Sequence, residues 1–119
     1  MGDWERESGD RLTRELLELP DPPSAILVMN DVMAVGVLRA AKELGVQVPD
    51  NLSVIGFDNR EFSDYLSPRI TTMDLPLHEM GYKAMEILHD LMQGKLRARP
   101  EMPMCRLIER DSVSSPPHN

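Results

Sequence analysis

Positive charge is scarce in this 119-residue chain, which has 13 Lys and Arg residues against 20 Asp and Glu residues and a formal net charge of -7. A protein that binds a nucleic-acid backbone needs a concentrated basic face, because much of its affinity comes from neutralised phosphates. The composition therefore argues against direct DNA binding by this chain. Its length suits one small domain or part of a larger one.

Cysteine is also scarce, since Cys105 is the single one. One cysteine cannot form an internal disulfide, which favours a reducing compartment. No apolar run approaches the length that crosses a bilayer, and the first ten residues lack the apolar core of a signal peptide. We therefore expect a cytoplasmic protein with no membrane contact.

Arrangements typical of enzymes and metal proteins are missing. No glycine-rich loop follows a strand segment, as a phosphate-binding loop requires. His78 and His89 lie eleven positions apart in one expected helix, so about three turns separate them and they cannot hold one metal ion. Cys105 is interpreted as a structural thiol, and "ERDS" at 109–112 as ordinary surface charge. We predict a protein that is not an enzyme, with no cofactor and no metal site.

What the sequence does contain is an alternation of helix and strand patterns. Leu12, Leu16 and Leu19 recur at helical spacing after Ser8, which is interpreted as the N-cap. Prolines within 20–23 end this segment, because proline lacks the backbone donor that a helix needs. The pattern predicts a first, amphipathic helix.

The following segments predict a strand–helix–strand unit. Residues 25–29 form a continuous apolar run, typical of a strand in a parallel sheet that is covered on both faces. Asn30 or Asp31 caps the next helix, and Gly45 stands where its C-terminal cap is expected. Residues 52–57 form the second strand, so the connection is expected to be right-handed.

Four further segments complete the expected fold. Residues 70–73 predict a short strand, 77–93 a long helix that Gly94 ends, and 103–110 a last strand. The polar, proline-rich residues 114–119 are expected to form a disordered tail. The fold class predicted is α/β, a three-layer parallel sheet with flanking helices.

Polar residues follow two of the predicted strands at the point where each ends. Asn30 and Asp31 follow the first, and Asp58 and Asn59 follow the second. In open α/β sheets ligands bind outside the carboxyl ends of the strands, and these side chains suit the hydroxyls of a small polar ligand. The same residue types also favour helix caps and turns. Local pattern alone leaves both interpretations open.

Three long segments carry a family pattern: "PPSAILVMNDVMAVGVLRAAKELGVQVPDNLSVIGFDN", "SPRITTMDLPLHEMGYKAMEIL" and "RLIERDSV". They resemble the C-terminal part of the effector-binding core of LacI/GalR-family transcriptional regulators, and the resemblance runs from Gly2 to about Val113. It implies that residues 1–113 form part of a periplasmic-binding-protein-like (flavodoxin-like) lobe. It also implies a chain that begins within this core, without the N-terminal head and most of the other lobe.

The resemblance implies a function and a set of site residues. Regulators of this family bind a small effector between two lobes and operator DNA through an N-terminal helix-turn-helix head. Trp4 matches a position where an aromatic ring stacks on the effector, and Asn30 and Asp58 match ligand-contacting positions. Val35 falls in the helix that contributes to the dimer interface. The expected partners are a sugar or nucleoside-like effector and a second copy, in a homodimer or a domain-swapped oligomer.

The sequence departs from the family pattern at Leu75, where many members have glutamine. The resemblance also implies that the chain crosses between lobes near Asp74, so that the helix from Leu77 belongs to the other lobe. A stand-alone or transport-type sugar-binding module is the alternative function. The missing signal sequence and the single cysteine argue against it.

Overall fold

The protein is described by a computed structural model over residues 3–95 and 101–116. The element order alternates strands and helices, as the sequence predicts. The elements are α1 (Arg6–Leu17), β1 (Ala25–Leu27), α2 (Asp31–Glu43), β2 (Ser53–Phe57), the 3-10 helix η1 (Glu61–Asp64), β3 (Thr71–Asp74), α3 (Leu77–Met92) and β4 (Arg106–Ile108).

The chain divides into two compact units. The first unit comprises residues 1–74 and 107–119, and the second comprises residues 75–106. The chain therefore passes between the units twice, once after Asp74 and once before Leu107.

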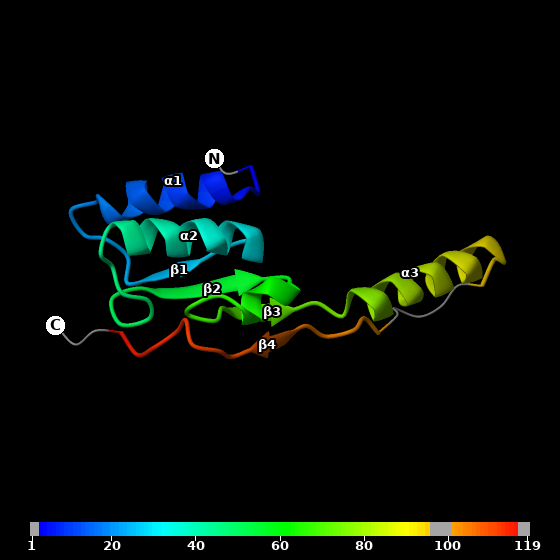
Figure 1. The fold of residues 1–119 in the computed structure, drawn as a ribbon. Coiled ribbons are helices and arrows are strands. Elements are labelled where there is room, and N and C mark those ends of the chain that lie inside the picture. Colours follow the sequence, from blue (N-terminus) through cyan, green and yellow to red (C-terminus); the bar gives the residue numbers. More distant parts are fainter. Residues whose placement is uncertain (1–2, 96–100, 117–119) are drawn as a thin grey trace. The chain divides into compact units, whose positions relative to one another are not determined.

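The strands form one sheet in the order β1-β2-β3-β4. The pairings of β1 with β2 and of β2 with β3 are parallel, with Ala25 opposite Ser53 and Ile55 opposite Thr71. Because these three strands run in one direction, their carboxyl ends lie at one edge of the sheet, as Figure 1 shows. The mixed α/β class with a mainly parallel sheet is confirmed.

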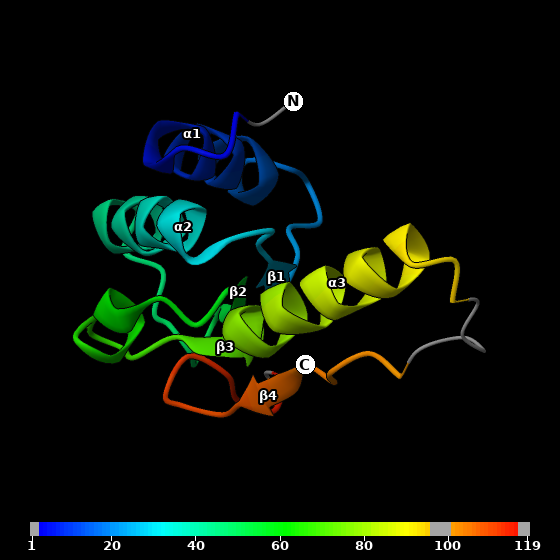
Figure 2. The same ribbon diagram turned by 90° about the vertical axis from the view of Figure 1, so that its right-hand side faces the viewer.

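Both helices of the first unit lie on the same side of the sheet, with α2 next to the strands and α1 beyond it (Figures 1 and 2). The expected cover on both faces is therefore absent from the described part of this unit. Phe57, the last residue of β2, is half-buried. The core lies between α2 and the strands, and its fully buried members are Val28, Ala34, Val37, Ala41, Leu52, Val54 and Ile70.

Helix α1 packs on α2 through small residues rather than through its leucines. A Cβ atom at Gly9 would overlap the Met33 carbonyl, and one at Gly36 would overlap the carbonyl of Arg6. Only glycine allows the two backbones to approach so closely. The buried residues of α1 are accordingly Ser8, Gly9 and Thr13, whereas Leu16 and Leu19 are exposed.

The predicted N-cap of α1 is wrong. The helix begins at Arg6 after Glu5, which makes no side-chain capping bond. Ser8 lies inside the first turn, and its hydroxyl donates back to the Glu5 carbonyl at 2.9 Å. The predicted caps of α2 are confirmed: the Asn30 side chain accepts from Met33 N at 2.7 Å, and Gly45 has a φ of +72°.

The segment after β4 is tied to β2 and β3 by Ser112, which is fully buried. Its hydroxyl donates to the Val54 carbonyl at 2.6 Å and accepts from Thr71 N at 2.8 Å. Strand β4 itself is shorter than the predicted 103–110. The tail at 114–119 stays a prediction: Ser114, at its start, donates to the Pro49 carbonyl at 3.0 Å, and residues 117–119 lie outside the described residues.

The second unit contains α3, a helix with an exposed apolar stripe. Leu77, Leu88 and Leu91, which the sequence places on one face, are 60%, 49% and 57% exposed. Gly94 ends the helix with a φ of +69°, as predicted. Cys105 is exposed, so it lacks the packing expected of a structural thiol. None of the helices that the structure describes has the length and apolarity to cross a membrane.

Candidate functional site at the carboxyl edge of the sheet

Asn30 joins the start of α2 to the residues before α1. Its Oδ1 accepts from Met33 N, and its Nδ2 donates to the Trp4 carbonyl at 3.0 Å. The capping interpretation of Asn30 is thus confirmed, and the same side chain brings Trp4 to the carboxyl end of β1. Trp4 has a positive φ of 70°, and it is 59% exposed. An aromatic residue with this exposure has a face available for stacking on a ligand.

Asp58 stands directly after β2 and has an unusual backbone. Its φ is 101°, and Asn59 follows with a φ of 51°. Such conformations cost about 1–3 kcal/mol each in a residue other than glycine, so other contacts must hold them. Two of these are backbone bonds to β3: Asp58 N donates to the Met73 carbonyl at 3.0 Å, and Asn59 N to Thr72 Oγ1 at 3.3 Å.

The carboxylate of Asp58 is half-buried and has no hydrogen-bond partner among the described residues. Desolvation, and then the charge of Asp31, raise the pKa of Asp58, while Arg60 lowers it. A desolvated carboxylate that lacks donors gains from a ligand that supplies them. The hydroxyl groups of a small polar ligand can do so.

Asp31 organises the loop after β2 although it is not exposed to any ligand. It is fully buried, and its Oδ2 accepts from Arg60 N at 2.8 Å and from the Ser63 hydroxyl at 2.6 Å. Its Oδ1 accepts from the Thr72 hydroxyl at 2.7 Å. We call these four residues the Asp31 cluster. It fixes the loop that carries Asp58 to both α2 and β3.

The sequence interpretation of Asp31, as a cap or ligand residue, missed this role. One sequence signal could have indicated it, because Gly56 interrupts an otherwise apolar strand. A Cβ atom at Gly56 would overlap Oδ1 of Asp31 and lie 3.0 Å from Ile70. The glycine therefore makes room for the buried carboxylate.

Arg110 closes the loop from the other side. Its guanidinium donates to Asn59 Oδ1 at 2.9 Å, to Asp64 Oδ1 at 3.1 Å and to the Ile70 carbonyl at 2.8 Å. The side chain is only 12% exposed. The interpretation of "ERDS" as ordinary surface charge is therefore wrong for Arg110. It does hold for its neighbour Asp111, which forms an exposed ion pair with Arg69.

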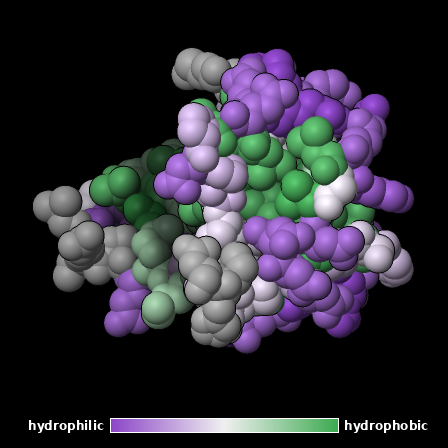
Figure 3. Space-filling view, turned by 90° about the vertical axis from the view of Figure 1, so that its left-hand side faces the viewer, coloured by the Kyte–Doolittle hydropathy of each residue, from purple (hydrophilic) through white to green (hydrophobic). Residues whose placement is uncertain are grey.

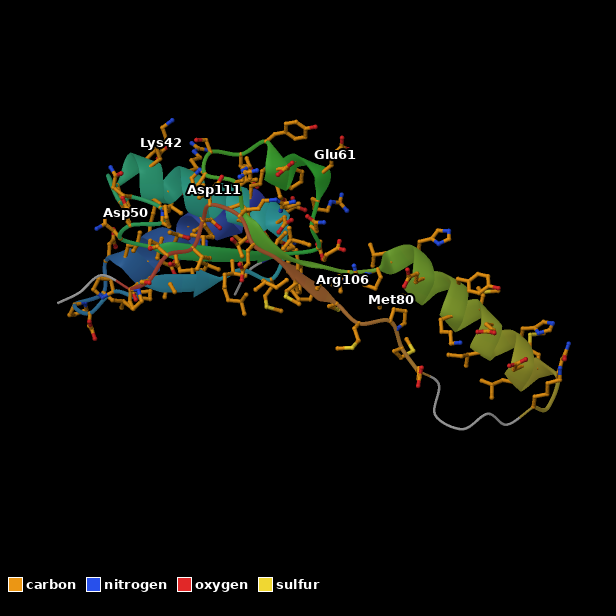
Figure 4. The ribbon with its side chains drawn as sticks, turned by 90° about the horizontal axis from the view of Figure 1, so that it is seen from below. Lys42, Asp50, Glu61, Met80, Arg106 and Asp111 are labelled. Carbon is orange, nitrogen blue, oxygen red and sulfur yellow. The ribbon has the colours of Figure 1, made fainter. Side chains whose placement is uncertain are left out.

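The surface around Val35 does not include the carboxylates of Asp31 and Asp58. Val35 is half-buried on α2 and lines a pocket of about 410 Å³ together with Val32, Phe62, Leu66, Glu5 and Arg6. Apolar side chains from α2 and from the η1 region thus meet at this surface. Figure 4 shows Glu61, the first residue of η1, at the opposite end of the first unit from Asp50.

A second pocket of about 490 Å³ lies at the C-terminal end of α2, beside Gly45 and Val46. Figure 3 shows apolar surface framed by hydrophilic residues on the face that carries this end. Arg39 and Lys42 contribute to its lining. The helix separates this pocket from Asn30 at its other end, so it is not part of the candidate site.

No group of three or more His, Cys, Asp or Glu residues that could hold a metal ion occurs in ranges 3–95 and 101–116. The polar groups at the carboxyl edge are instead amides, hydroxyls and carboxylates, and those of the Asp31 cluster are bonded to one another. Such a site can bind a small ligand through hydrogen bonds and stacking.

The model of the periplasmic binding protein-like domain family matches residues 1–113. The chain belongs to this family. The resemblance to LacI/GalR-family regulators is confirmed by individual relatives. The chain is 41% identical over 117 residues to the HTH-type transcriptional repressor CytR of Escherichia coli (strain K12), an alignment that covers 98% of this chain and 34% of CytR. The chain therefore spans about a third of the length of this relative.

Two solved structures extend the similarity to three dimensions. One is the Lac repressor dimer bound to operator and the anti-inducer ONPF, with a TM-score of 0.88, 32% identity and coverage of 96% of this chain and 40% of that chain. The other is a LacI family transcriptional regulator from Enterococcus faecium with bound ribose, with a TM-score of 0.76, 28% identity and coverage of 98% and 42%. This chain thus spans about two fifths of the length of each of these two solved chains.

Proposed function

We propose that this chain is part of the effector-binding core of a cytoplasmic LacI-type transcriptional regulator that senses a small sugar, nucleoside or related metabolite. Trp4, Asn30 and Asp58 contact the effector in this proposal. Operator DNA is bound by a separate N-terminal head, and the protein is not an enzyme. Transcriptional repression by CytR and the operator-bound Lac repressor dimer support this assignment.

The observation that carries the proposal is the state of Asp58. Its carboxylate is partly desolvated and has no hydrogen-bond donor among the described residues, yet two backbone bonds and the Asp31 cluster hold its loop in place. A polar group prepared in this way gives binding energy to a ligand that donates to it, because the cost of ordering has been met by the fold. The bound ribose in the Enterococcus faecium regulator supports a ligand rich in hydroxyls.

Trp4 and Asn30 complete the ligand contacts on the other side of the edge. The bond from Asn30 to the Trp4 carbonyl holds the backbone of Trp4, from which the indole side chain extends. An indole face suits the apolar face of a pyranose or the π-face of a base. Within ranges 3–95 and 101–116, the Asn30 amide makes these two bonds and keeps one N–H without an acceptor.

The proposal includes a homodimer formed through the surface that contains Val35. The pocket at this surface is lined by four apolar side chains and by the charged residues Glu5 and Arg6. An apolar centre with a charged rim is typical of a protein interface. The operator-bound Lac repressor is also a dimer.

The test is a titration of the complete regulator with D-ribose and with the four ribonucleosides, in which isothermal calorimetry measures the Kd of each ligand. Asn is tolerated at positive φ, so Asp58→Asn removes the charge without adding backbone strain. It should weaken binding by roughly tenfold or more, since hydrogen bonds to charged groups contribute about 1.5–3 kcal/mol. Asp50→Asn, an exposed carboxylate at the other end of the unit, is the matched control. Equal affinity of both variants and the original protein would remove Asp58 from the site.

A further inference from the structure

Two covalent connections join the second unit to the first. The chain leaves the first unit after Asp74, at the end of β3, and returns at Leu107, within β4. Any effect of a ligand on the second unit that passes through the chain must pass through these two places. The side chains that hold the flanking residues are therefore of interest.

Asn59 contacts residues beside both connections. Its Nδ2 donates to Asp74 Oδ1 at 2.9 Å, and its Oδ1 accepts from Arg110 Nη2 at 2.9 Å. Asp74 is the last residue before the outgoing connection, and Arg110 lies three residues after the returning one. A single amide thus bridges the outgoing and the returning segments.

The chemistry of asparagine suits this bridge. The amide donates to a carboxylate with one end and accepts from a guanidinium with the other, which neither aspartate nor an apolar residue can do. Its φ of 51° lies in the left-handed region, which asparagine tolerates better than most residues. Both hydrogen bonds have a charged partner, so they are of the stronger kind.

Asn59 is also rigidly joined to Asp58. The two consecutive positive φ values leave little freedom between them, and Asp58 N and Asn59 N both donate to β3. Arg60, the next residue, is held by Asp31. A change in the position of Asp58 would therefore also change the position of the Asn59 side chain in the bridge.

We propose that Asn59 is a positioning residue that couples ligand contact at Asp58 to the two connections of the second unit. The inference rests on the proposed function, since it requires an effector at Asp58. In the absence of the bridge, the ligand still binds, but it no longer changes how the two connecting segments are held relative to each other. Loss of the bridge thus leaves ligand binding intact and removes the effect of the ligand on operator binding.

The experiment uses the complete regulator and operator DNA selected from a random pool by the original protein. The probes are D-ribose and the four ribonucleosides. For each protein, calorimetry gives the Kd of the ligand, and anisotropy gives the Kd of labelled operator with and without saturating ligand. The ratio of the larger operator Kd to the smaller one measures the coupling between ligand binding and operator binding.

Asn59→Gly removes the bridge and keeps the backbone conformation accessible. We expect its ligand Kd to stay within about threefold, while the ratio of operator Kd values falls on the order of tenfold towards 1. Asn59→Asp keeps the Arg110 bond and sets two carboxylates together at Asp74, so its ratio should be intermediate. Asn51→Gly, which removes an exposed asparagine bonded to Gln47 N, is the control and should leave both quantities unchanged.

Three results would overturn the inference. One is an unchanged ratio in Asn59→Gly, and a second is a ligand Kd that rises in proportion to the fall in the ratio. The third is loss of the circular dichroism spectrum in both Asn59 variants, because Asn59 would then be needed only for folding. If no probe alters operator binding of the original protein, the proposed function itself fails, and this outcome is distinct from the other three.

Discussion

The hydrogen bond from Thr72 to Asp31 gives a sharp test of the Asp31 cluster. Thr72 is fully buried, and its hydroxyl donates to Asp31 Oδ1 at 2.7 Å. Thr72→Val keeps the shape and the β-branch, so it leaves no large cavity and preserves strand propensity. It leaves a buried carboxylate oxygen without its donor, and Asn59 N loses its acceptor.

The expected loss is about 1.5–3 kcal/mol of unfolding free energy, the range for a hydrogen bond to a charged group. Thr13→Val is the matched control, because Thr13 is also buried and its hydroxyl donates at 2.7 Å to the Gly9 carbonyl. That carbonyl is neutral and lies within a helix, where the backbone supplies its usual donor. The control should therefore cost less than about 1 kcal/mol.

Urea unfolding of this chain, followed by circular dichroism at one low protein concentration, measures both variants. The two m-values should agree with that of the original chain, so that midpoints can be compared. Equal losses in Thr72→Val and Thr13→Val would refute the reasoning, since the charge on Asp31 would then contribute nothing.

The remaining predictions concern the charge of Asp58 and the exposed stripe of α3. Burial raises the pKa of Asp58 above its ordinary value of 3.8, so the folded chain keeps this proton to higher pH than the unfolded chain does. The group then lowers stability as pH rises through the folded pKa. Asp58→Asn should therefore be more stable than the original chain at pH 7 and lose that advantage below pH 3.8 in a urea series; a gain that persists there would contradict this. The stripe around Leu88 should drive self-association, because exposed apolar patches of this kind find partners. Light scattering over a dilution series should show dimers or larger species, which Leu88→Glu dissociates and His89→Glu, beside the stripe, does not; a compact monomer at high concentration would count against it.

Local sequence signals determined most of the secondary structure. Asn30 and Gly45 bound α2 as predicted, because a cap depends on hydrogen bonds within one turn. The strands at 25–27, 53–57 and 71–74 follow from short apolar and β-branched runs. The parallel arrangement then follows from the strand–helix–strand order, and it accounts for the location of Asn30 and Asp58 at one edge of the sheet.

The same local signals failed where the environment of a residue is set by distant partners. Serine is a residue type typical of N-caps, but α1 begins at Arg6, so that Ser8 lies within the helix beside Gly9, where the backbone of α2 approaches closely. Its leucines predict a buried stripe, yet the face that fits against α2 is the one with the smallest side chains. Helix periodicity does not say which face a neighbour will accept.

The Asp31 cluster and the Arg110 bonds belong to the tertiary structure alone. Asp31 and Thr72 are 41 positions apart, and Arg110 and Asn59 are 51 apart. From the local sequence, each of these side chains is predicted to be a cap, a turn residue or a surface charge. In the unfolded chain, water supplies the hydrogen bonds of each side chain equally well. Folding removes that water from Asp31 and most of it from Arg110, and a buried charge must then find its partners among whatever the topology brings near. The sequence by itself determined which strands end in polar groups, and the packing of β2 against β3 and α2 decided which of those groups, such as Asp31, are buried and bonded within the protein.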